Sequence, residues 1–307
     1  MRIIGPDQLI FGVEDLDACV QCLTDYGLKK VESGSHGANF EALDGTGVIV
    51  RRAGDAALAP ATAPSPNLRE TLYGVADAAT LEVIGAELGK DRAVQADARG
   101  ILHATDDDGY PIAFQLSTRR AERPPHYGVN VPGQLPGRFI NQVGAIDAER
   151  PMAYSLSHLV MFTRDKARST RFYAERLGFR TVDVFDNLGP FMRPAGTYEH
   201  HTLFLIQAPS TGLQHFTFHF AGANEVFKAG WEFQRKGYQS FWGPGRHIFG
   251  SNWFWYFNSP FGGLIEFDAD MDLHDDSWVP RHAVANAETS QTFLCTGTEK
   301  WSPRGKH

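Results

Sequence analysis

The chain has 307 residues, of which 42% are apolar, and a net charge of −7 at neutral pH. This length favours two domains, and an acidic balance without a long basic run argues against nucleic acid or an anionic membrane as a partner. The first residues lack the pattern of a secretion signal and no apolar run approaches the length of a membrane span, so we expect a cytoplasmic protein.

The segment from Asp7 to Glu32 reads as a strand, a charged turn, an amphipathic helix closed by Gly27 and a second strand. Cys19 and Cys22 form a CxxC pair within the helical pattern. The chain has three cysteines, so no second pair exists to complete a zinc site. We interpret the pair as helix-packing residues, with redox chemistry of the thioredoxin type as the alternative.

The same order of elements recurs from Ser157 to Asp183, where Gly178 takes the place of Gly27. Farther along, a glycine turn that enters a strand near residue 110 matches the turn and strand that follow Pro260. Self-similarity with so long a period indicates that the two halves of the chain are related units.

The repeat divides the chain into an amino-terminal domain at 1–118, a linker at 119–153, a carboxy-terminal domain at 154–270 and a tail at 271–307. The linker contains PPHYGVNVPGQLPGRF, whose prolines and glycines exclude a regular helix. A loop of this length usually packs on a domain or carries function, so we expect it to wrap the domain junction. The tail is too aromatic for simple disorder and is predicted to fold back on the carboxy-terminal domain.

Three polar residues in apolar strands of the second half are candidate metal ligands. His158 lies in SLSHLVMFT, His215 in GLQHFTFHF and Glu266 in LIEF. Each histidine alone is more often a core or surface residue, but a carboxylate in a buried strand needs a partner or a metal. Two histidines and one carboxylate from separate strands are the facial triad of non-haem Fe(II) sites. In the first half, Gln8 and Ala113 take the places of His158 and Glu266, so that half is predicted to lack the metal.

The string GRHIFGSNWFWYFNSPFGGLIE combines an aromatic strand, a proline-glycine turn and the strand that bears Glu266. It resembles the signature of the type I extradiol ring-cleaving dioxygenases of the vicinal oxygen chelate superfamily, in which Gly-x-His is followed by an apolar residue and Tyr, a Pro-x-Gly turn and Glu. The matching residues are Gly245, His247, Tyr256, Pro260, Gly262 and Glu266. The string departs from the usual pattern at Gly250, Trp255 and Ser259.

The resemblance implies an α+β fold in which tandem βαβββ modules form two similar domains. It places a metal site inside the open barrel-like sheet of the carboxy-terminal domain, with His158, His215 and Glu266 as ligands. The implied cofactor is Fe(II), with Mn(II) as the alternative. The implied activity is extradiol cleavage of a catechol by dioxygen, which gives a ring-opened semialdehyde. We expect small-molecule partners only, and a homo-oligomer.

The remaining site residues follow from the same resemblance. His201 corresponds to the acid/base group, while Tyr256 and His247 would hydrogen-bond the catechol oxygen. Because neighbours on a strand point to opposite faces, only one residue of the pair His200 and His201 can enter the pocket. On this register Leu203 and Leu205 would join His201 on the pocket wall, and His200 would be a surface or supporting residue. The predicted substrate pocket contains Phe191, Trp242, Phe249, Asn252 and Phe254, and Arg246 or Arg281 could meet a substrate carboxylate.

Other classes of function stay open. The same fold serves oxygenases of the 4-hydroxyphenylpyruvate type, which have no need of His247 and Tyr256. It also serves glyoxalase-like isomerases, which draw ligands from both halves, and Gln8 and Ala113 argue against this reading. A protein of the drug-sequestering type would bind an aromatic ligand without turning it over and has no reason to keep a complete metal triad. Metal analysis separates these classes.

Overall fold

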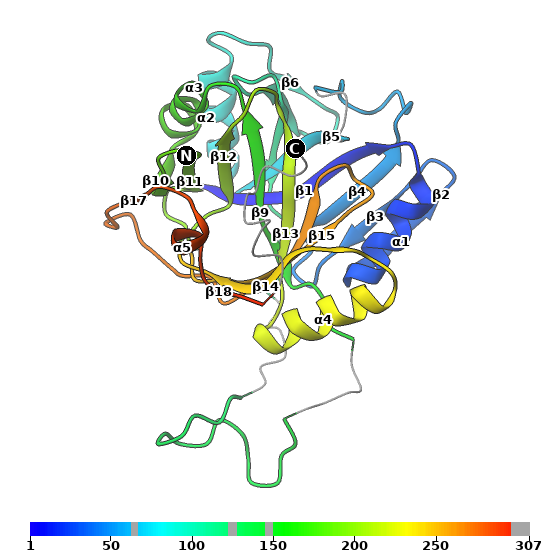
Figure 1. The fold of residues 1–307 in the computed structure, drawn as a ribbon. Helices are drawn as coiled ribbons and strands as arrows, with labels where there is room; N and C mark the ends of the chain where they lie inside the picture. Colours follow the sequence, from blue (N-terminus) through cyan, green and yellow to red (C-terminus); the bar gives the residue numbers. More distant parts are fainter. Residues whose placement is uncertain (63–66, 122–127, 145–149, 296–307) are drawn as a thin grey trace.

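The structure is a computed structural model that describes residues 1–62, 67–121, 128–144 and 150–295. Its two large sheets lie against each other, and helices cover their outer sides (Figure 1). The predicted α+β class is confirmed, because each sheet is built from two consecutive βαβββ modules. Among the described residues, no helix combines the length and apolar character needed to cross a bilayer.

The amino-terminal sheet has eight strands in the order β2-β3-β4-β1-β5-β8-β7-β6. Its first module comprises β1 (Ile3–Val13), α1 (Leu16–Tyr26), β2 (Lys29–Gly34), β3 (Gly37–Glu41) and β4 (Gly47–Arg52). Its second module comprises β5 (Leu68–Val75), α2 (Ala78–Leu88), β6 (Gln95–Ala96), β7 (Leu102–Thr105) and β8 (Pro111–Leu116).

The carboxy-terminal sheet has ten strands in the order β17-β10-β11-β12-β9-β13-β16-β15-β14-β18. Its first module comprises β9 (Ser155–Thr163), α3 (Lys166–Arg171), the π-helical turn η1 (Phe172–Arg176), β10 (Phe179–Phe185), β11 (Gly189–Pro194) and β12 (Leu203–Gln207). Its second module comprises β13 (Gly212–His219), α4 (Ala223–Arg235), β14 (Ser240–His247), β15 (Trp253–Asn258) and β16 (Leu264–Ala269).

The tail supplies both edge strands of the second sheet. Strand β17 (Arg281–Ala283) pairs with β10, and β18 (Gln291–Leu294), which follows the short helix α5 (Ala287–Ser290), pairs with β14. Up to residue 295 the tail thus pairs with both edges of this sheet. Residues 296–307, which include the aromatic residue Trp301, lie outside the described part of the chain.

Helix α1 shows how local sequence sets the elements. It begins after Asp15, whose carboxylate accepts a hydrogen bond from the Ala18 amide, and it ends at Gly27 with φ of 116°. Cys19 and Cys22 lie on its buried face as free thiols. Burial raises the pKa of Cys19 to about 12, so the thiolate needed for redox chemistry is disfavoured. The helix-packing interpretation of the CxxC pair agrees with this environment.

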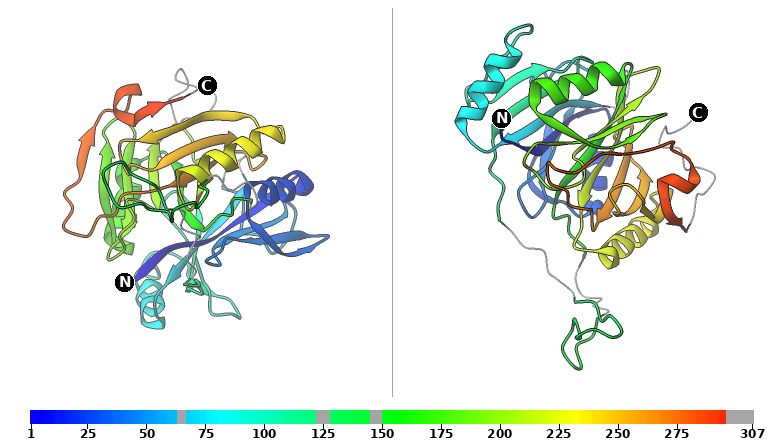
Figure 2. Two further views of the ribbon diagram at one scale, coloured as in Figure 1. Left: turned by 90° about the horizontal axis from the view of Figure 1, so that it is seen from below. Right: turned by 90° about the vertical axis from the view of Figure 1, so that its left-hand side faces the viewer.

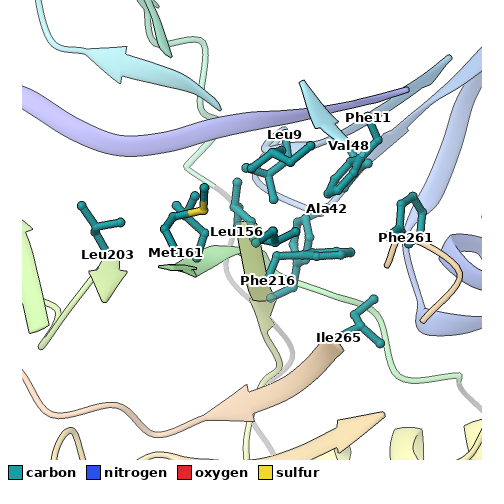
Figure 3. Packing of buried hydrophobic residues seen from close by; sticks show 14 of the residues in the cluster. Leu9, Phe11, Ala42, Val48, Leu156, Met161, Leu203, Phe216, Phe261 and Ile265 are labelled. Atoms are coloured by element: carbon teal, nitrogen blue, oxygen red, sulfur yellow. The ribbon is translucent and has the colours of Figure 1, made fainter. Parts of the chain in front are cut away.

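A continuous apolar core joins the two sheets. Phe11 of β1 packs against Phe216 of β13 at a centroid distance of 5.4 Å and against Phe261 at 4.8 Å (Figure 3). The Tyr26 hydroxyl of α1 donates a hydrogen bond to the backbone carbonyl of Glu266. The amino-terminal half therefore supports, from behind, the strand that carries the candidate carboxylate ligand.

Strand register confirms the internal repeat. Cross-strand neighbours in the first sheet are Gln8, Leu72 and Ala113. Their counterparts in the second sheet are His158, Thr217 and Glu266. In the first sheet Glu70 pairs with Ile10, and in the second sheet His215 pairs with Val160. Glu70 therefore occupies the position that corresponds to His215. Oε1 of Glu70 is hydrogen-bonded to Nδ1 of His103 at 2.8 Å, so the first half carries a different set of polar groups at these positions.

The linker differs from its prediction. Residues 128–144 form a loop that closes on itself, with the Arg138 amide hydrogen-bonded to Asn130, and they project away from the body of the protein rather than wrapping the junction (Figures 1 and 2). Leu135, Phe139 and Ile140 are 90%, 87% and 83% exposed. The prediction followed the usual behaviour of long loops, but this loop makes its hydrogen bonds locally. Residues 122–127 and 145–149 lie outside the described part of the chain.

Candidate active site

Three ligand atoms converge at the middle of the second sheet. The Nε2 atom of His158 on β9 lies 3.2 Å from Nε2 of His215 on β13 and 3.1 Å from Oε2 of Glu266 on β16. The third side of the triangle, from His215 Nε2 to Glu266 Oε2, is 3.2 Å. All three side chains are buried. They form the one candidate metal cluster found among the described residues.

The three residues fit a divalent metal. Ligands at right angles around a metal with bonds of about 2.1 Å lie about 3.0 Å apart, close to the three observed separations. Three lone-pair atoms facing one another are repulsive unless a proton or cation lies among them. Moreover, Oε1 of Glu266 is buried without a hydrogen bond from any described residue. An open face of two nitrogens and one oxygen is suited to a catalytic metal that keeps free positions.

Neighbouring groups orient the ligands. The Thr217 hydroxyl donates a 2.6 Å hydrogen bond to Oε2 of Glu266. On the other side, Ser157 Oγ lies 2.8 Å from Nδ1 of His158 and donates to the buried carboxylate of Asp268 at 3.1 Å. Nδ1 of His215 pairs with the amide oxygen of Gln214. Such partners fix the ring orientation and leave Nε2 of each histidine for a metal.

The charge states also suit metal binding. Burial would raise the pKa of the Glu266 carboxyl, but the adjacent imidazoles of His158 and His215 hold this pKa well below its usual range. Burial lowers the pKa of His215 to about 4. The site therefore presents an ionised carboxylate beside a neutral imidazole near neutral pH, which are the forms that bind metals.

The three predicted catalytic residues surround this cluster. The ring of His201 lies 4.3 Å from that of His158, between centroids. Nε2 of His247, at the end of β14, lies 3.1 Å from the Tyr256 hydroxyl on β15, and 3.6 Å from Oε1 of Glu266. The structure therefore brings all six predicted metal and catalytic residues together, from five strands and the segment before β12.

The segment with the two adjacent histidines corrects the predicted strand register. His200 and His201 lie just before β12, so strand alternation does not apply to them. His201 lines the cavity as predicted, whereas Phe204 lines it in place of Leu203 and Leu205, which pack in the core. His200 is fully buried and lies 2.9 Å from His201 between Nδ1 atoms, so the surface alternative is wrong and the supporting one applies.

An aromatic cavity of about 50 Å³ opens at the candidate metal cluster. Phe191, Trp242, Phe249 and Asn252 line it as predicted. Phe254 does not: it packs behind the wall, where its ring stacks on His247 at 4.0 Å. Residues that the sequence reasoning did not place in the cavity are Val160, Phe185, Leu188, Phe204 and Ser290.

Neither arginine proposed for a substrate carboxylate reaches the cavity. Arg246 pairs with Asp270 at 2.8 Å, and Arg281 pairs with the buried Asp183. The lining contains no lysine or arginine. Its surface is apolar apart from the histidines, Tyr256, Asn252 and Ser290.

Comparisons with known proteins agree with this geometry. Residues 155–267 match the Glyoxalase/Bleomycin resistance protein/Dioxygenase superfamily. Metapyrocatechase 2 of Cupriavidus necator is 34% identical over 144 residues, which cover 46% of this chain and 45% of the relative. The chain thus aligns with about half the length of this curated relative.

Two solved structures illustrate the likeness of the whole fold. The Mn(II)-bound glyoxalase from Novosphingobium aromaticivorans has a TM-score of 0.77 at 20% identity and covers 97% of this chain and 94% of its own. The homoprotocatechuate 2,3-dioxygenase from Arthrobacter globiformis has a TM-score of 0.73 at 17% identity, with 98% and 90% covered. At such identities the likeness is one of fold. Residues 155–267 therefore resemble the glyoxalase and dioxygenase superfamily, and the whole chain shares the fold of these solved structures.

Proposed function

We propose that this protein is an Fe(II)-dependent extradiol dioxygenase that cleaves a catechol with dioxygen to a ring-opened semialdehyde. The observation that carries the proposal is that all six predicted metal and catalytic residues meet at one site, five of them in the cavity lining and Glu266 beside them. The cluster His158, His215 and Glu266 would hold the metal, and His201, His247 and Tyr256 face the same space. A binding protein or an isomerase with ligands in both halves has no use for this combination. The domain limits at 118 and 154 form part of the proposal.

A bound Fe(II) would hold both catechol oxygens and relay electrons from the ring to dioxygen. The protein side chains then handle protons and position. His201 is suited to accept a catechol proton and to return it, because burial and the neighbouring His158 hold its pKa well below the usual range and leave the ring neutral. Tyr256 and His247 form a hydrogen-bonded pair that can stabilise charge on the catechol oxygen.

Iron is proposed over manganese on the chemistry of the donors. Two imidazoles and one carboxylate with open positions are typical of non-haem Fe(II) oxygenases, whereas Mn(II) prefers a set richer in oxygen. Manganese is the alternative, because a glyoxalase of similar fold binds Mn(II). Analysis of the bound metal distinguishes the two.

The cavity indicates the substrate class within this proposal. Phe185, Phe191, Phe204 and Phe249 make a continuous aromatic wall, with Phe191 stacked on Phe204 at 3.9 Å. A substituent on the catechol ring would therefore be apolar. A substrate carboxylate would be buried without a cation, which costs several kcal/mol. We propose an alkyl- or aryl-substituted catechol.

A homo-oligomer in the cytoplasm completes the proposal. The projecting loop of 128–144 exposes Leu135, Phe139 and Ile140, and a second copy could cover these side chains. Cys295 is an exposed free thiol, which agrees with a reducing compartment. Measuring mass in solution for the wild type and for a Phe139→Asp variant tests the assembly, since a loss of the oligomer in the variant is expected.

The direct test uses protein purified without oxygen and loaded with Fe(II). Alkyl- and aryl-catechols should give the yellow ring-opened product, while a catechol with a carboxylate side chain should react at least about 100-fold less efficiently. Glu266→Gln should abolish metal retention and turnover. Glu70→Gln, which changes the carboxylate at the place of His215 in the first sheet, is the control and should leave both intact. Loss of turnover in the control alone would refute the assignment of the site.

A further inference from the structure

A chain of buried polar groups runs from His201 away from the cavity. Nδ1 of His201 lies 2.9 Å from Nδ1 of His200, and Nε2 of His200 lies 2.8 Å from Oδ2 of Asp183 on β10. His200 and Asp183 are fully buried. The two rings stand perpendicular, with 90° between their planes. The chain therefore links the candidate acid/base group, just before β12, to a carboxylate on β10, two strands away in the sheet.

The hydrogen-bond pattern determines which nitrogen of each ring carries a proton. Burial would raise the pKa of Asp183, but hydrogen bonds from His200 and Arg281 lower it to about 2, so the carboxylate only accepts. Nε2 of His200 must then donate. A neutral imidazole has one N–H, so Nδ1 of His200 is an acceptor and Nδ1 of His201 must be its donor. Nε2 of His201 is left with a free lone pair.

The tail holds the carboxylate end of this chain in place. The backbone amide of Arg281 on β17 donates to Oδ1 of Asp183 at 2.8 Å, and its guanidinium contacts both carboxylate oxygens. The same guanidinium lies 4.9 Å from the centroid of Phe249, a wall residue of the cavity. The parallel pairing of β17 with β10 fixes this arrangement, because Asp183 and Arg281 are direct cross-strand partners.

The other side of His200 is closed by a tight loop. Gly250 has φ of 84°, and a Cβ at that position would lie 3.2 Å from Nδ1 of His200. This contact accounts for glycine at one of the positions where the sequence departs from the dioxygenase pattern. The ring of His200 is therefore confined by packing as well as by its two hydrogen bonds.

We infer that His200 and Asp183 are positioning residues that hold His201 in the tautomer with Nδ1 protonated and Nε2 free to accept a proton, and that Arg281 of the tail anchors them. The inference rests on the proposed function for its catalytic consequence. Its tautomer statement concerns this chain alone. The alternative is a purely structural role, in which Arg281 and His200 only provide the hydrogen bonds that a buried carboxylate requires. The experiments below distinguish this structural role from the positioning role.

Nitrogen-15 NMR of metal-free protein labelled at histidine measures the tautomers without any turnover. Signals of His201 are assigned by their loss in His201→Ala. We expect Nδ1 of His201 to be protonated and Nε2 not, and Asp183→Asn to convert part of the population to the other tautomer, since an amide both donates and accepts. Protonation at Nε2 of His201 in the wild type, or unchanged tautomers in Asp183→Asn, would overturn the inference even if the protein is a dioxygenase.

A double-mutant cycle on the Fe(II)-loaded protein tests the catalytic consequence. Asp183→Asn should lower kcat by about 10- to 100-fold with iron content and KM little changed. In a His201→Ala background it should cost nothing further, because its effect passes through His201. Equal losses in both backgrounds would show a structural role and overturn the inference. A wild type without ring cleavage would refute the proposed function, while the NMR result would still decide the tautomer.

Two further variants keep this cycle decisive. Asp186→Asn is the matched control, because Asp186, the residue after β10, also contacts β17, through His282 at 2.8 Å, but from an exposed position. It should change neither kcat nor tautomers. Should Asp183→Asn fail to fold, Arg281→Gln loosens the same carboxylate from a partly exposed position and is expected to lower kcat in the same direction. An Arg281→Gln protein with wild-type kcat and tautomers would contradict the anchoring role.

Discussion

The hydroxyl of Thr217 offers a quantitative test of the metal site. It donates a 2.6 Å hydrogen bond to Oε2 of Glu266, the carboxylate oxygen of the candidate ligand triangle. Both groups are buried, so removal of the donor leaves a charged acceptor without that partner. Loss of a partner that orients a metal ligand typically lowers metal affinity by about 10- to 100-fold, which corresponds to about 1.4–2.8 kcal/mol. Thr217→Val should weaken Fe(II) binding by that factor.

The assay is anaerobic competition for Fe(II) between the protein and a coloured chelator. Thr217→Ser, which keeps the hydroxyl, should restore most of the affinity. Thr202→Val is a matched control, because the hydroxyl of this buried threonine has no hydrogen-bond partner among the described residues. Equal affinities for Thr217→Val and the wild type would refute the reasoning, and so would an equal loss in the Thr202 control.

Three other outcomes are expected. His201→Ala should retain iron and bind catechol, yet lose kcat by about two to four powers of ten, the range for a positioned acid/base group; unchanged kcat would transfer the proton role to His247 or Tyr256. Burial raises the pKa of Asp106, which accepts a hydrogen bond from Tyr173, to about 7. Between about pH 4 and pH 7 the folded protein therefore binds one more proton than the unfolded chain, so the free energy of unfolding falls as pH rises through this range. Asp106→Asn should remove this pH dependence from denaturation curves measured across the range. Phe185→Ala should favour a bulkier catechol substituent by about 10-fold in kcat/KM, and an unchanged preference would show that the substituent lies elsewhere.

Much of the fold and the site follows from sequence because the chemistry is concentrated in short strings. Polar residues such as His158 and Glu266 in apolar strands need an explanation, and a metal supplies one for both. The repeat with Gln8 and Ala113 could be read for the same reason, since strand register keeps equivalent positions in line. These inferences depend only on local pattern and on the periodicity of strands.

The supporting residues could not be found in this way. Asp183 and Thr217 become partners of the site only when separate strands pair, and an aspartate at the end of a strand is common. The face of His201 was inferred from alternation in a strand that begins two residues later. This shift moved Phe204 into the cavity and Leu203 out of it. The projecting loop likewise gives no local signal, because its composition suits any irregular segment.

Oxygen uptake in a single turnover tests the central claim most directly. Protein loaded with one Fe(II) per chain and saturated with an alkyl-catechol should consume one dioxygen for each ring opened, with the yellow product appearing at the same rate. Loaded with Mn(II) and given a glutathione hemithioacetal, it should show no isomerase activity. Isomerase activity without oxygen uptake in either metal form would contradict the account and assign the site to the other chemistry of this fold.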